Sequence, residues 1–163
     1  MKRVLLLAVF CIVSLSNAAA QKAPGPGSII EKDLAGFEKC SLGKKLISSI
    51  EWLHKKGRPV KREESMLVFA IKTDFMGMPV TGIEIGICEG DGSRDCGWGA
   101  FVGLEIPVPL KEAAAIAKKR TGIDYTIEKR SKPEEGAYTL RPLLAKNPDK
   151  KNESVLFCDP GAL

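Results

Sequence analysis

The cysteines restrict the fold of this chain more than any other sequence feature. Once a leader containing Cys11 is removed, four cysteines remain: Cys40, Cys88, Cys96 and Cys158. In an exported chain this number is typical of two disulfides, with three possible connectivities. Cys88 and Cys96 flank the turn-forming segment Glu-Gly-Asp-Gly-Ser-Arg-Asp, so we expect them to pair. The second disulfide then joins Cys40 to Cys158.

The first twenty residues have the pattern of a secretory signal peptide. Lys2 and Arg3 form a basic start, the segment 4–15 carries no charge, and small residues end at Ala20. An apolar helix of about twelve residues rises only about 18 Å, which is too short for a hydrocarbon layer of about 30 Å. We expect cleavage after Ala20 or, as a second choice, after Ala18. The mature protein is then periplasmic or extracellular and has no membrane anchor.

Composition supports a single folded domain. The chain has 163 residues, 44% of them hydrophobic, which argues against a disordered chain, a collagen-like repeat or a polytopic membrane protein. Loss of Lys2 and Arg3 lowers the net charge from +5 to +3, and the basic residues are spread over the chain, so nucleic acid is not an expected partner. Residues 21–39, which include two Pro-Gly pairs, are predicted to be a flexible lead-in to a domain over residues 40–163.

Two segments have the features of helices. Over residues 41–56, leucine and isoleucine recur at helical spacing, Ser41 can cap the start, and Gly57 can end the helix. The second predicted helix covers residues 110–121 and ends at Gly122, with Pro109 near its first turn.

The remaining segments predict strands. The run 65–73 is continuously apolar, whereas 79–88 and 102–106 alternate isoleucine, valine or leucine with glycine or glutamate, so that one strand face is buried and the other nearly bare. Segments 124–130, 137–144 and 154–158 are the later predicted strands. The fold class is therefore α+β, in the order α-β-β-β-α-β-β(-β). It consists of one antiparallel sheet of five or six strands, with two helices on one face and disulfides for stabilisation.

Candidate catalytic chemistry is sparse. His54 is the only histidine and falls at the edge of the apolar face of the first helix, where a structural role is the better interpretation. No nucleophile elbow, phosphate-binding loop or zinc-protease motif is present in the sequence, and the cysteines are better used as disulfides. The segment 89–95 resembles the first half of a calcium loop. It has Arg94 where the loop needs glycine and Ala100 where it needs a carboxylate, so we expect no metal and no cofactor.

The segment between Cys88 and Cys96 is the best candidate for binding. A disulfide would order this polar loop in advance and so lower the entropy cost of binding. Arg94 lies within it and Trp98 follows it, between two glycines, and both residue types are frequent in binding hot spots. Asp91, Arg94 and Trp98 are therefore the predicted contact residues.

Three functional hypotheses follow from the sequence. The first is a module that binds another envelope or extracellular protein non-covalently, such as an inhibitor, an immunity protein or an assembly accessory. The second is a small secreted hydrolase that uses two carboxylates, because any two of the chain's twenty acidic residues can meet in space. The third is a carrier that holds a small apolar ligand between the sheet and the helices.

Overall fold

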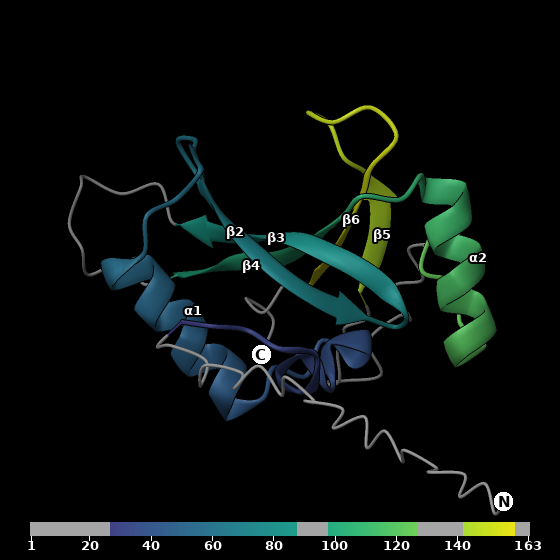
Figure 1. Cartoon of the computed structure of the whole chain (residues 1–163), viewed down its shortest axis with the longest axis horizontal. Coiled ribbons are helices and arrows are strands. Elements are labelled where there is room, and N and C mark those ends of the chain that lie inside the picture. The colour runs from purple at the N-terminus through teal and green to yellow at the C-terminus, as the bar shows by residue number, and fades with distance from the viewer. Residues whose placement is uncertain (1–26, 88–97, 127–141, 159–163) are drawn as a thin grey trace, which may run out of the picture.

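The computed structural model describes residues 27–87, 98–126 and 142–158, and the structural statements below concern these residues. Two 3-10 helices come first, followed by helices and strands in α+β order (Figure 1). The elements are η1 (Glu31–Leu34), η2 (Phe37–Lys39), α1 (Lys44–Lys56), β1 (Lys61–Arg62), β2 (Met66–Phe75), β3 (Met78–Ile87), β4 (Trp98–Ile106), α2 (Leu110–Thr121), β5 (Leu143–Lys146) and β6 (Ser154–Cys158).

The strands form one antiparallel sheet in the order β1-β2-β3-β4-β6-β5, which confirms the predicted fold class. β2 and β3 join through a two-residue turn in which Met76 and Gly77 both have positive φ, at 52° and 77°. Such a turn matches the twist of the flanking strands. β4 then occupies the centre of the sheet, between β3 and β6.

One face of this sheet forms the main core together with both helices. Side chains from β2, β3, β4 and β6 meet Ile50 of α1 and Ala113 of α2 in a single buried cluster. Figure 1 shows the two helices near opposite ends of the sheet. The prediction of two helices packed on one face is therefore confirmed. None of the helices in the described ranges is long and apolar enough to cross a membrane.

Residues 27–39, which precede α1, pack as part of the fold. The flexible lead-in predicted over 21–39 is therefore wrong for these residues, and 21–26 lie outside the described residues. Leu34 and Phe37 are fully buried, and the ring of Phe37 packs edge-on against Phe75 of β2, with centroids 5.9 Å apart. Asp33, also buried, accepts a hydrogen bond from the backbone of Ile30 and forms an ion pair with Lys45 at 3.0 Å. These contacts fix the entry to α1.

The predicted disulfide between Cys40 and Cys158 is present, with Cα atoms 5.4 Å apart. It ties the end of η2 to the end of β6. The predicted pair Cys88 and Cys96 lies outside the described residues.

The first helix begins later than the sequence predicted. It starts at Lys44 with Gly43 at its N-cap, and Ser41 instead donates its backbone N–H to Gly36 in the preceding turn. Trp52 of α1 is half-buried, and a Cβ on Gly27 would overlap its ring. The chain just before η1 therefore covers this tryptophan.

The later strands also differ from the predicted boundaries. Residues 124–126 form a turn, in which Asp124 accepts hydrogen bonds from the backbone and hydroxyl of Thr126, and the rest of the predicted strand 124–130 lies outside the described residues. β5 covers Leu143–Lys146 and so ends two residues later than the strand predicted over 137–144, of which residues 137–141 lie outside the described residues, whereas β6 was predicted correctly. The two-residue strand β1 has too little sequence to show a pattern.

Candidate functional site

The predicted binding loop joins two central strands. Ile87 at the end of β3 pairs with Trp98 at the start of β4, so the chain leaves and re-enters the sheet at neighbouring positions. Asp91 and Arg94 lie outside the described residues, and only the backbone of Trp98 is described. Their role as contact residues stays a prediction.

The described residues place a different group of charged side chains together, on the second face of the sheet, meaning the side opposite α1 and α2. Glu84 in β3 and Glu105 in β4 point to this face, because their neighbours in sequence point into the main core. Both are buried, with 9% and 6% of their surface exposed. The sequence predicted a nearly bare surface here, and that prediction was wrong.

Two glycines make room for these carboxyl groups. Gly82 pairs with Glu105 across β3 and β4, and Gly103 pairs with Glu84. A Cβ on Gly82 would overlap the carboxylate of Glu105, and a Cβ on Gly103 would lie 3.0 Å from Oε2 of Glu84. Each glutamate therefore lies over the glycine of the neighbouring strand.

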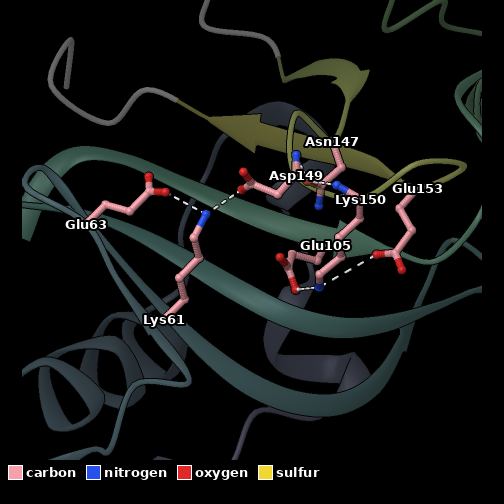
Figure 2. A network of polar contacts seen from close by, with 7 residues as sticks. All are labelled: Lys61, Glu63, Glu105, Asn147, Asp149, Lys150 and Glu153. Carbon is pink, nitrogen blue, oxygen red and sulfur yellow. Dashed lines mark hydrogen bonds and ion pairs between the residues drawn. The ribbon is translucent and has the colours of Figure 1, made fainter.

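Two lysines cover the second face and bind four of its carboxylates (Figure 2). Lys150 Nζ lies 2.8 Å from Glu105 Oε2 and 3.7 Å from Glu153 Oε2. Lys61 Nζ lies 2.6 Å from Asp149 Oδ2 and also pairs with Glu63. Hydrogen bonds to these carboxylates raise the pKa of both lysines, chiefly the bond to Glu105 for Lys150 and the bond to Asp149 for Lys61. Both lysines therefore remain charged at neutral pH.

The turn between β5 and β6 positions Asp149 and Lys150. Oδ1 of the buried Asn147 accepts hydrogen bonds from the backbone N–H groups of both residues, at 2.9 and 3.2 Å. The backbone N–H of Asn147 in turn donates to the carbonyl of Glu153. Asn147 thereby directs the side chains of Asp149 and Lys150 back over the sheet (Figure 2).

Glu84 differs electrostatically from its neighbours. Burial raises its pKa to about 7, and the nearby carboxylates of Glu105 and then Asp149 act in the same direction. Lys150 and Lys61 oppose this effect only in part. Within the described part of the chain, no hydrogen bond or ion pair reaches the Glu84 carboxyl group. It is the one carboxyl group of this cluster that is left without a cation.

The second face can therefore hold a proton at Glu84, beside the ion pair of Glu105 and Lys150. It lacks an imidazole, because His54 is on α1 and α1 packs against the other face. Among the residues that the structure describes, no group of three or more His, Cys, Asp or Glu has a geometry suited to a metal ion.

Sequence reasoning missed this site, although a signal was present. Gly82-Ile83-Glu84 and Gly103-Leu104-Glu105 repeat the same pattern, glycine followed two residues later by glutamate. On two neighbouring antiparallel strands, this repeat can place each glutamate opposite the glycine of the other strand. Only the register shows that it does so here.

Comparison with protein-family models, with curated proteins and with solved structures finds no match to this chain.

Proposed function

We propose that the protein is an exported module that binds another protein of the envelope or extracellular medium non-covalently, as an inhibitor, immunity protein or assembly accessory does. The observation that carries the proposal is the carboxyl group of Glu84, which is buried and has no cation among the described residues. Leaving such a group unpaired costs folding free energy. A protein that binds a partner there can recover part of this cost.

The position of the predicted binding loop supports the same proposal. Glu84 lies three residues before Ile87, where the chain enters the loop, which is about 10 Å along an extended strand. The loop returns at Trp98, on the strand that carries Glu105. A partner that contacts Asp91, Arg94 and Trp98 can therefore also reach the second face.

Export is supported by the basic and apolar start of the sequence and by the disulfide between Cys40 and Cys158. Intact mass spectrometry of the protein isolated from its source tests this part of the proposal. We expect a mature chain that begins at or near Gln21 and carries no lipid. A chain that retains Met1 would contradict it.

Binding is tested by affinity capture from the envelope and extracellular fractions, followed by calorimetry with the purified partner. We expect Trp98→Ala to weaken binding by about 2 kcal/mol or more, the usual cost of a hot-spot truncation. Glu112→Gln, an exposed position on α2, is the control and should bind as the wild type does. If Trp98→Ala lowers the melting temperature but the folded fraction binds normally, Trp98 is not a contact residue.

A small hydrolase is the second candidate, because Glu84 and Glu105 lie on neighbouring strands and only Glu105 has a cation as partner. Glu84, with a pKa of about 7, can hold a proton, whereas Glu105 forms an ion pair with Lys150. This division of roles is the one that paired-carboxylate hydrolases use. A substrate that contacts both carboxyl groups would, however, have to displace Lys150 from Glu105, which is why binding is our first proposal.

Turnover separates the two candidates. If the protein is a hydrolase, it should cleave glycosidic bonds in a panel of cell-wall polymers and aryl glycosides, and both Glu84→Gln and Glu105→Gln should abolish cleavage. If the protein binds a partner but cleaves nothing in this panel, the hydrolase is contradicted and the protein-binding module remains. The carrier hypothesis gains no support, because side chains of the helices and the sheet meet in one buried cluster where an apolar ligand was expected.

A further inference from the structure

We infer that the second face recognises a basic side chain of the partner, an arginine or a lysine, which enters beside Glu84 as the missing cation of the cluster. This inference deepens the proposed binding function and depends on it for the partner. It rests on the pairing of charges over the sheet, on the surroundings of Glu84 and on its burial.

The ion pairs of the second face leave one acidic residue, Glu84, without a lysine partner. Within the described part of the chain, the cluster over the second face has two lysines, and each already bridges two acidic residues. Lys61 binds Glu63 and Asp149, whereas Lys150 binds Glu105 and Glu153. Glu84 is the fifth acidic residue, and neither lysine forms an ion pair with it.

The neighbours of Glu84 cannot supply a hydrogen-bond donor. Its partners across the sheet are Val68 on β2 and Gly103 on β4, and neither side has a polar group. Beyond Gly103 lies Val155 of β6, whose Cγ1 is 3.1 Å from the place of a Cβ on that glycine. The backbone N–H groups of paired strands are in general used by the sheet itself. No side chain of the described residues therefore donates to this carboxyl group, and its oxygens are not among the fully buried atoms without a partner, so an incoming group can reach them.

The charged groups around Glu84 make the binding of a cation beside it favourable. Glu105 on β4 and Asp149 in the β5–β6 turn act on it unfavourably as like charges, and Lys150 and Lys61 offset them only in part. The whole chain, in contrast, has a net charge of +5, so a basic ligand is not drawn to it in general. Attraction of a basic group is a local property of this face. An arginine fits well, because its planar guanidinium matches a carboxylate and is weakly hydrated.

A peptide titration tests the inference directly. The probe is a short arginine-containing peptide, and its control is the same peptide with citrulline, which is neutral and has nearly the same shape. With the mature protein at pH 8, we expect the arginine peptide to bind and the citrulline peptide not to bind. Glu84→Gln should weaken binding at least tenfold, whereas Glu112→Gln, which removes the same charge from α2, should leave it unchanged.

A spectroscopic readout identifies the group that is involved. In protein labelled with carbon-13 at glutamate carboxyl groups, the titration of Glu84 should move to lower pH when the arginine peptide is added. Equal affinity of Glu84→Gln and the wild type would overturn the inference. So would a Glu84 that titrates below pH 4.5 without peptide, because a cation of the same chain would then already occupy the site.

The two levels of the proposal fail separately. If the captured partner binds Glu84→Gln as tightly as the wild type, the binding function holds and the basic side chain at Glu84 is wrong. If the wild type captures no partner, the proposed function is wrong, and the peptide titration still shows whether Glu84 binds a cation.

Discussion

At the scale of single residues, the carboxyl group of Glu84 links this site to the stability of the fold. Its pKa is about 7 in the folded protein and close to 4.5 in a solvated chain. Between these values the folded state holds a proton that the unfolded state has released. The contribution of Glu84 to the free energy of unfolding is therefore greatest below about pH 4.5, and it decreases as the pH rises toward 7.

Replacement of Glu84 by glutamine tests this dependence. Because glutamine cannot ionise, Glu84→Gln should be more stable than the wild type at pH 8, by roughly 3 kcal/mol at most, since one pKa unit corresponds to about 1.4 kcal/mol. Near pH 4.5 the two proteins should be equally stable. Urea unfolding at both pH values measures the difference.

The control for this experiment is Glu112→Gln, which removes a carboxylate from the exposed side of α2. Because this carboxylate lies in the first turn of α2, its removal should cost about 0.3–1 kcal/mol at pH 8, and it should not stabilise the protein. A Glu84→Gln protein that is less stable than the wild type at pH 8 would contradict the prediction, because it would show that the Glu84 carboxylate is favourably paired in the folded protein.

At the scale of elements, the site depends on the register of β3 and β4. Each carboxyl group needs a glycine opposite it, and the pairs Gly82–Glu105 and Glu84–Gly103 provide this twice. A shift of either strand by one residue would turn its glutamate into the main core, where Ile83 and Leu104 are fully buried. The two strands are therefore fixed by the core on one face and by the fit of glutamate over glycine on the other.

Gly82→Ala tests the fit of glutamate over glycine. The added Cβ would overlap the carboxylate of Glu105, so this side chain must leave Lys150, and we expect a loss of about 1 kcal/mol in unfolding free energy. In a Glu105→Ala background nothing is displaced. There, the same substitution should be neutral or stabilising by about 0.5 kcal/mol, because glycine weakens a strand interior. Equal effects in the two backgrounds would refute the proposed fit.

The elements that were predicted well are those with a local signal. α2 was predicted with its observed boundaries because Pro109 and Gly122 mark both ends, and Gly122 has the positive φ of 74° that a helix C-terminus favours. The start of α1 was predicted too early, because Ser41 resembles a cap in sequence but is used by the turn that follows η2. That turn is held by tertiary contacts of Phe37, which no local pattern reports.

At the scale of the whole molecule, the sheet and the β5–β6 turn bring distant segments together over the second face. β1 and β5 are the two edges of the sheet, and six flat strands would separate them by about 24 Å. Lys61 of β1 nevertheless lies 2.6 Å from Asp149, in the turn after β5. The sheet and this turn therefore bend over Glu84 and Glu105.

This bending explains why the fold class could be predicted from the sequence and the site could not. Alternation of apolar residues predicts which side of a strand faces the main core. This prediction is confirmed for Ile83, Ile85 and Leu104. It does not report what covers the other side. Lys150 is 45 residues from Glu105 in sequence, and their contact depends on how the β5–β6 turn folds back. Only the three-dimensional arrangement brings the two together.

The disulfide between Cys40 and Cys158 acts at the same scale, because it joins the segment before α1 to the last strand across a separation of 118 residues. Closing so long a loop reduces the entropy of the unfolded chain, which corresponds to about 5 kcal/mol in the chain-entropy treatment. The double replacement Cys40→Ala and Cys158→Ala should therefore lower the unfolding free energy by about that amount, as measured by urea unfolding.

The matched control is Cys88→Ala with Cys96→Ala, which opens the short predicted loop and should cost only about 2.5 kcal/mol. If the loss at Cys40 and Cys158 is below about 1 kcal/mol, the packing of Leu34 and Phe37 alone holds the two ends together. If the order of the two losses is reversed, the short loop has structure that the native fold depends on. We expect the larger loss of unfolding free energy when Cys40 and Cys158 are replaced. This result would show that the long-range disulfide constrains the unfolded chain more than the short predicted one does.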